Sequence, residues 1–233
     1  MLINFKKKYV FVRSTKVAST SLIRTIWKEE TRGQRILTHG GFLISNSMLA
    51  LTEDSSSKKN LSFPKKFHLS LHEVKELFRD DEFENFFKFS IVRNPYSHAV
   101  SRFLYEEVIV KKLFKNFFKL NNRRKLALLK SFVMKPNNRM IFKVFLKNFY
   151  KGQKKFLGEN LDDFDYLLRF ESLENDFQIL KKKFELKAKI NFLNKHRDTF
   201  SHMKNLYDEE CIDLVYQNEK NIIERFNYKF PLL

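Results

Sequence analysis

Short apolar runs that lead into a polar turn and then a helical pattern recur in this chain, and they limit the folds open to it. Residues 8–13 form a β-branched and aromatic run, and residues 20–30 follow with apolar side chains three and four apart. Residues 87–93 repeat this order, and Asn94-Pro95 ends the strand because a residue before proline disfavours helix. Strands that alternate with helices favour an α/β domain with a mostly parallel sheet.

Polar residues mark where the predicted helices begin. Ser19 or Thr20 would cap the helix at 20–30 by accepting hydrogen bonds from its first turn. Ser70 followed by Glu73 is a capping-box pattern ahead of a short apolar run. Asp208 precedes the last helical pattern of the chain and is expected to start it.

The length of the chain limits the number of domains, and its charge limits the classes of binding partner. A chain of 233 residues with 43% apolar residues predicts one domain over 1–233. Residues 110–157 contain only neutral and basic residues, rich in Lys and Phe, and predict a basic helical insertion broken near Pro136. The net charge of +18 points to nucleic acid, anionic lipid, an acidic glycan or a phosphate-rich cofactor as partner.

The cysteine content and the lack of an apolar targeting segment indicate the cellular compartment. The single cysteine, Cys211, excludes an intrachain disulfide and a cysteine-based zinc site. The first 14 residues lack the apolar core of a secretory signal, and the longest uncharged run, 36–52, is too short and polar to span a bilayer. We therefore expect a cytoplasmic protein without a metal site.

Residues 13–22, RSTKVASTSL, join the first predicted strand to the first predicted helix. A helix N-terminus presents backbone N–H groups and a positive dipole end, which suits a phosphate. Small residues at 18–21 allow close approach, the hydroxyls at 19–21 can donate hydrogen bonds, and Lys16 adds a positive charge. The loop has no glycine and lacks the Walker spacing of nucleotide-binding loops. It predicts a phosphate site, with an ordinary capped helix as the alternative.

Arg93 ends the second predicted strand. Ligands of doubly wound sheets bind beyond the carboxyl ends of the strands, so Arg13 and Arg93 are both expected near the binding edge. The planar guanidinium group of arginine suits a phosphate. A surface arginine that merely ends a strand is the alternative.

Together these segments resemble the carbohydrate sulfotransferases, which include the heparan sulfate 2-O-sulfotransferases. KVASTSL at 16–22 resembles their 5′-phosphosulfate loop, and FSIVRNPYSHAVSRF at 89–103 resembles their 3′-phosphate motif. HLSLHEV at 68–74, LLRFESL at 167–173 and the tail from LNKHRD at 193–198 are similar to further family segments in the same order. Residues 110–157 have no counterpart in the resemblance.

The resemblance implies a P-loop-like three-layer fold and the donor 3′-phosphoadenosine-5′-phosphosulfate (PAPS), used without a metal. Lys16 would contact the phosphosulfate and its bridging oxygen, Arg93 and Ser101 would hold the 3′-phosphate, and Lys195 and Arg197 would close over the nucleotide. The implied 5′-phosphate contacts are Val17, Ala18, Ser19, Thr20 and Ser21. The chain departs from the family at Thr15, where proline is usual, and at His98, where many members have a second arginine.

Transfer to a hydroxyl also requires a base, and histidine suits this role because its pKa lies near neutrality. The resemblance assigns the base to His68, which precedes a capping box and lies between the two cofactor motifs. His39, ahead of two glycines, is the second candidate. His72 lies inside a predicted helix and is expected to be a solvated or supporting residue. His98, His196 and His202 are lesser candidates.

The expected function is therefore transfer of a sulfuryl group from PAPS to a hydroxyl of a glycan or glycolipid. Residues 110–157 could hold the enzyme at an anionic membrane, on its inner face, and no specific nucleic acid is expected as a partner. One alternative is a kinase-like P-loop enzyme, which would need glycine spacing and a carboxylate for Mg²⁺. The other is a basic protein that binds nucleic acid or anionic membranes.

Overall fold

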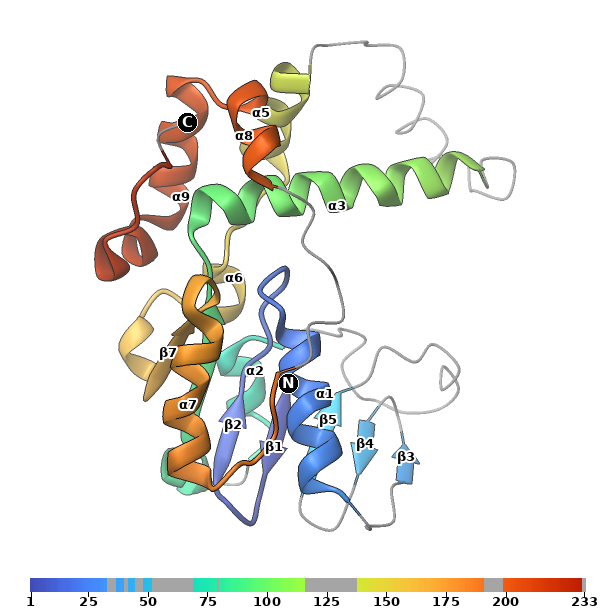
Figure 1. Ribbon diagram of the computed structural model, residues 1–233, viewed down its shortest axis with the longest axis vertical. Coiled ribbons are helices and arrows are strands. Elements are labelled where there is room, and N and C mark those ends of the chain that lie inside the picture. The colour runs from blue at the N-terminus through green and yellow to red at the C-terminus, as the bar shows by residue number, and fades with distance from the viewer. Residues whose placement is uncertain are drawn as a thin grey trace. The chain divides into compact units, whose positions relative to one another are not determined.

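The computed structural model describes residues 1–32, 37–39, 42–44, 48–51, 69–78, 80–115, 138–190 and 199–231. The chain divides into two compact units, which we call the sheet unit and the helical unit (Figure 1). The sheet unit is Met1–Arg93 with Gln153–Lys195, and the helical unit is Asn94–Gly152 with His196–Leu233. Of the predicted insertion at 110–157, the part up to Gly152 belongs to the helical unit and the rest to the sheet unit.

The sheet unit holds all the strands that the structure describes. They are β1 (Leu2–Asn4), β2 (Tyr9–Phe11), β3 (Leu37–His39), β4 (Phe42–Ile44), β5 (Met48–Leu51), β6 (Phe87–Val92) and β7 (Tyr166–Arg169). Its helices are α1 (Ser19–Glu30), α2 (Leu71–Lys75), α6 (Lys154–Leu157) and α7 (Leu173–Phe184), with 3-10 turns η2 (Asp80–Asn85), η4 (Leu161–Asp163) and η5 (Phe170–Ser172). The expected strands at 8–13 and 87–93 correspond to β2 and β6.

The strands form one sheet in the order β3-β4-β5-β1-β2-β6-β7. β2 pairs with β6 and β6 with β7 in parallel, whereas β1 pairs with β2 antiparallel. The mostly parallel sheet of the sequence prediction is thus found in β1-β2-β6-β7. The strands β3 to β5 extend it through β1 with antiparallel pairings only. β1 itself was not predicted, because a three-residue strand is too short to show an alternating pattern.

Helices α1 and α7 cover one face of the sheet, and their apolar stripes fill a shared core (Figure 1). The rings of Phe11 and Phe89 stack across β2 and β6 with centroids 5.1 Å apart. Val10 lies between Tyr9 and Phe11 and faces the opposite side, yet it is also fully buried. Both faces of the central strands are therefore covered, which confirms an α/β unit compatible with a three-layer fold.

The helical unit contains α3 (Pro95–Lys115), α5 (Asn138–Asn148), α8 (Thr199–Leu206) and α9 (Glu209–Phe226). Apolar and aromatic side chains of all four helices meet in a second core, which includes Phe103, Phe142, Met203 and Val215. None of the helices that the structure describes combines the length and the apolar character needed to cross a bilayer.

The first residues of three helices can be compared with the predicted caps. The capping box before α2 is confirmed, because Ser70 Oγ accepts from the Glu73 N–H and Glu73 Oε2 accepts from the Ser70 N–H. Asp208 caps α9 as predicted, and its carboxylate accepts from the Cys211 N–H at 2.9 Å. The cap of α1 was predicted wrongly: its N-cap residue is Ala18, and no side chain caps the helix.

Replacing Asp208 with alanine is expected to destabilise the protein by about 1 kcal/mol at neutral pH, because α9 loses its cap. The hydrogen bond from the Cys211 N–H, helped by Lys143, lowers the pKa of Asp208 to about 2. A carboxyl group with a lowered pKa stabilises the fold above its unfolded-state pKa near 3.8 and loses this effect as the pH falls toward 2. Urea unfolding of both proteins should therefore show a difference at pH 7 that shrinks below about pH 4.

The exposed Asp213, further along α9, provides the matched control. Asp213→Ala removes the same charge from the same helix without touching its cap. If Asp208→Ala cost no more free energy of unfolding than Asp213→Ala at pH 7, the capping role would be wrong.

Candidate anion-binding site

The ends of β2 and β6 bring the two predicted phosphate-binding segments to one edge of the sheet. Phe11 lies opposite Phe89 in the parallel pairing, so the carboxyl ends of both strands point the same way. The Val12 N–H donates to the Phe89 carbonyl at 3.0 Å, and Ser90 Oγ donates to the Val12 carbonyl at 2.7 Å. Arg13 and Arg93 follow directly, so both lie at the edge where the sequence predicts a ligand.

The backbone between β2 and α1 adopts an unusual conformation. Lys16 has φ 60° and Ala18 has φ 59°, the left-handed region that glycine normally occupies. Each such residue costs about 1–2 kcal/mol when it carries a side chain. Alternation of left- and right-handed residues turns successive N–H groups toward one point and creates concave anion sites. Strain of this kind is concentrated at functional sites, where surrounding contacts hold it in place.

Some hydroxyl groups of this loop are buried, and Thr20 is partly exposed to solvent. Ser19 Oγ donates to the Ser14 carbonyl at 2.7 Å, a buried bond that closes the loop on itself. Thr20 Oγ1 accepts from Arg13, which leaves its own hydroxyl proton to donate elsewhere. The Ser14 side chain is fully buried, and its Oγ has no hydrogen-bond partner among the described residues. Of the predicted hydroxyl ligands, Thr20 is the half-exposed one, whereas Ser19 and Ser21 are buried.

Arg93 is held rigidly against the loop. Its Nη1 donates to the Lys16 carbonyl at 3.0 Å, and its guanidinium group lies 4.4 Å from the centroid of the Phe170 ring. The Gln153 side chain fixes its backbone in both directions: Oε1 accepts from the Arg93 N–H and Nε2 donates to the Arg93 carbonyl, each at 2.8 Å. A planar group placed in this way is preorganised for an anion.

Positive charge gathers at this edge. Arg13 Nη2 donates to Thr20 Oγ1 at 2.7 Å, so its guanidinium group packs beside the first turn of α1. Arg13 and Arg93 thus both donate to neutral oxygens of the loop. With the Lys16 ammonium group and the helix dipole, the loop forms a site suited to a phosphate or sulfate group. No cluster of potential metal ligands occurs among the residues that the structure describes.

The structure does not test the other predicted site residues. Ser101 lies on α3 in the helical unit, so its contact with the anion of Arg93 stays a prediction. The backbone of His39 belongs to β3, where it pairs with Phe42. The first base candidate, His68, and the residues of the predicted nucleotide-closing loop, Lys195 and Arg197, fall outside the described residues.

Two further histidines have clear surroundings. His98 is buried in the helical unit, and its Nδ1 lies 2.9 Å from the Tyr150 hydroxyl, which donates to Glu219 Oε1 at 2.9 Å. Burial, and next the Glu219 carboxylate, raise the pKa of Tyr150 well above its ordinary value. His98 therefore supports a core at the position where the resembled family has an arginine. His72 is largely exposed on α2, in keeping with its expected solvated role.

Sequence reasoning missed Gln153 and Phe170. Phe170 directly follows β7, the neighbour of β6, just as Arg93 follows β6, so the strand prediction could have placed it at the same edge. Gln153 lies 60 residues from Arg93, and no local pattern identifies its role.

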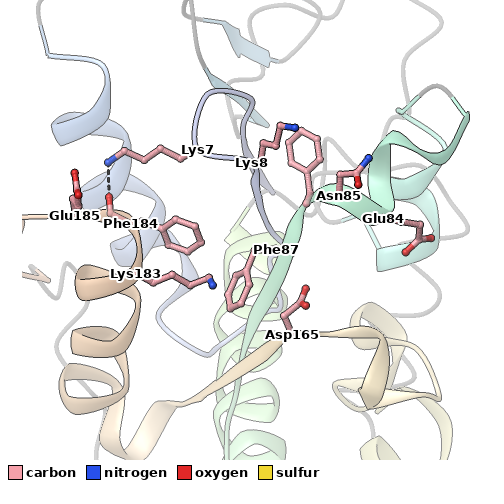
Figure 2. Close-up of a pocket in the computed structure, with 10 residues that line it drawn as sticks. Lys7, Lys8, Glu84, Asn85, Phe87, Asp165, Lys183, Phe184 and Glu185 are labelled. Atoms are coloured by element: carbon pink, nitrogen blue, oxygen red, sulfur yellow. Dashed lines mark hydrogen bonds between the residues drawn. The ribbon is translucent and has the colours of Figure 1, made fainter.

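An open depression of about 560 Å³ lies at the opposite edge of the sheet, by the start of β6 (Figure 2). The β1–β2 turn and the end of α7 border it, and Phe87 and Asp165 also line it. The charges of Lys7, Lys8 and Lys183 are balanced by those of Glu84, Asp165 and Glu185. This depression is therefore distinct from the basic loop.

Comparisons with known proteins identify no relative: no family model matches the chain, and neither a curated protein nor a solved structure matches it significantly.

Proposed function

We propose that this chain is a PAPS-dependent sulfotransferase that acts on a carbohydrate hydroxyl. The observation that carries the proposal is the hydrogen bond from Arg93 Nη1 to the Lys16 carbonyl. It joins the two segments that resemble the 5′-phosphosulfate and 3′-phosphate motifs, although they lie 77 residues apart in the sequence. PAPS carries phosphate groups on the 5′ and 3′ positions of its ribose, so its binding site needs two anion-binding segments next to each other.

The loop also supports a P-loop-like site over an ordinary capped helix. An ordinary cap would place a side-chain oxygen over the first N–H groups of α1, but Ala18 offers none. The left-handed residues Lys16 and Ala18 shape the loop without glycine. This separates it from the Walker loop of kinases, which relies on glycine for close approach to ATP.

PAPS would supply the sulfuryl group, and the residues of the chain would bind and stabilise it. The loop N–H groups and the Thr20 hydroxyl would hold the 5′-phosphate, and Arg93 would hold the 3′-phosphate. The Lys16 ammonium group would neutralise charge on the bridging oxygen as its bond to sulfur breaks. The acceptor oxygen forms the new bond to sulfur, and its proton passes to a base.

The acceptor side of the reaction rests on the sequence. His68 and His39 remain the candidates for the base, whereas buried His98 lacks the exposure that a glycan would require. A glycan or glycolipid acceptor and a cytoplasmic location stay predictions.

The product PAP (3′-phosphoadenosine-5′-phosphate) is expected to raise the melting temperature of the protein, whereas ATP with Mg²⁺ is not. At a hundredfold excess over the dissociation constant, a ligand adds about 2.7 kcal/mol, or roughly 5–10 °C for a chain of this size. Lys16→Gly should abolish this shift because it removes the ammonium group. The same change should stabilise the unliganded fold by up to about 1 kcal/mol, since glycine relieves the left-handed strain.

Lys8→Gly is the matched control. Lys8 also has a left-handed φ, 49°, but it lies in the β1–β2 turn at the other edge of the sheet. The exchange removes the same charge and the same strain, and the PAP shift should persist. Transfer of labelled sulfate from PAPS to a panel of glycans would then identify the acceptor. A shift with ATP alone would favour the kinase-like alternative, and the absence of both PAP binding and sulfate transfer would refute the proposal.

A further inference from the structure

The helical unit exposes a concentrated apolar surface on α5 and the residue that follows it. Seven large apolar side chains are exposed among the described residues, and four of them lie within ten consecutive positions. These four, which we call the α5 patch, are Met140 at 53% exposed, Ile141 at 37%, Val144 at 50% and Phe149 at 68%. Single exposed apolar residues are common on proteins, but a contiguous group marks an interaction site.

Three members of the patch, Met140, Ile141 and Val144, are exposed side chains of α5 itself. Met140 and Val144 are four residues apart, so they lie next to each other on the helix surface, with Ile141 beside them. The opposite stripe, Phe142, Phe145 and Leu146, is buried in the core with α3, α8 and α9. Exposure of the patch is therefore not a sign of poor packing, because α5 already has a complete core-facing stripe.

The sequence that contains the patch is basic. Residues 108–157 of the sequence contain 15 Lys and Arg residues and no Asp or Glu. Next to the patch, Arg139 and Lys151 are exposed, at the start of α5 and just after it. Lys143 and Lys147 contact carboxylates at the start of α9: Lys143 pairs with Asp208 and Glu210, and Lys147 pairs with Glu210.

We propose that the α5 patch docks the protein on an anionic lipid bilayer. Helices that lie in the membrane interface combine a buried apolar face with Lys and Arg that reach the headgroups. The patch supplies Met, Ile, Val and Phe for the acyl boundary, and the exposed Arg139 and Lys151 beside it supply the attraction to anionic headgroups. A nucleic acid would use the positive charge but would gain nothing from exposed Met140, Ile141 and Val144. The inference goes beyond the proposed sulfuryl transfer and does not depend on it.

Cosedimentation with vesicles tests this proposal on the full chain. Binding is expected to an equimolar mixture of phosphatidylcholine and phosphatidylglycerol, with little binding to phosphatidylcholine alone, and high salt should weaken it. The variant Met140→Ser/Val144→Ser/Phe149→Ser should reduce the partition coefficient by about tenfold or more. The control is Ile179→Ser on α7, which removes an equally exposed apolar side chain, 54%, from the sheet unit and should leave binding unchanged.

A second variant guards against misfolding of the triple variant. Phe149→Trp places an indole ring just after the end of α5, and its emission should shift to the blue when anionic vesicles are added. The native Trp27 is buried against α1 and the sheet, so its emission should stay constant. Binding that is equal on neutral and anionic vesicles, or unaffected by the triple variant, would overturn the proposal. Loss of a dimer in the triple variant without any vesicle binding would assign the patch to self-association instead.

Discussion

Arg93→Lys is expected to weaken PAP binding by about tenfold to a hundredfold, although the positive charge is kept. The guanidinium group donates to the Lys16 carbonyl, and its Cζ atom lies over the Phe170 ring, 4.4 Å from the ring centroid. A lysine ammonium group cannot make the hydrogen bond to the Lys16 carbonyl and offer further planar donors at the same time. Hydrogen bonds that involve a charged group contribute about 1.5–3 kcal/mol, which corresponds to the expected change in the dissociation constant. Calorimetric titration with PAP measures it.

The control for this prediction is Arg169→Lys. Arg169 ends β7, next to β6 and at the same edge, but its guanidinium group is paired with Asp176 at 3.1 Å. Because this charge is already matched by a carboxylate, PAP affinity should change by less than about twofold. If the Arg93→Lys variant bound PAP as tightly as the unmodified protein, Arg93 would support the fold and would not bind the ligand.

Gly152→Ala is expected to destabilise the protein by about 2–4 kcal/mol. Gly152 has φ 65°, which an L-residue adopts only with strain. A Cβ atom built there would lie 2.7 Å from Glu219 Cδ and 2.8 Å from Oε1, closer than real contacts allow. Glu219 cannot easily retreat, because it is buried and its Oε1 accepts from the Tyr150 hydroxyl. Urea unfolding measures the loss.

A double-mutant cycle separates the clash from the strain. In a Glu219→Ala background the carboxylate is gone, so Gly152→Ala should cost only the strain, about 1–2 kcal/mol. Gly158→Ala is the control, because Gly158 has φ 84° but its added Cβ would meet nothing within 4 Å. Its cost should be the same with and without Glu219. Additive effects of Gly152→Ala and Glu219→Ala would show that the close approach does not constrain the helical unit.

Much of the local structure could be predicted from the sequence. The helix at 20–30, the strand at 87–93, the capping box at Ser70 and the cap at Asp208 all depend on residues within one or two turns of each other. The position of Arg13 and Arg93 at the carboxyl ends of two strands followed from the alternation of strands and helices, and the parallel pairing of β2 with β6 places both at one edge. The failure at α1 is informative, because Ser19 looks like a cap but its hydroxyl donates to the Ser14 carbonyl.

The candidate site also has features that the sequence predicts and features that it does not. The residue types at 13–22 and at 93 were enough to predict an anion site, because positive charge, hydroxyls and a helix start are local properties. The left-handed Lys16 could not be predicted, since its own sequence gives no reason for strain. The Lys16 carbonyl accepts from Arg93, and Arg93 is held by Gln153 and Phe170, so contacts across 60 to 77 residues hold this conformation.

The sequence by itself thus determined where the principal helices start and which side chains follow the ends of β2 and β6. Only the tertiary structure decided that the chain divides into two units of two segments each, that antiparallel strands extend the sheet, and that His98 joins Tyr150 and Glu219 in a core. The physical reason is the range of the interactions. Periodicity and capping act between near neighbours and are visible in the sequence, whereas strand pairing and buried polar networks join residues far apart in the chain.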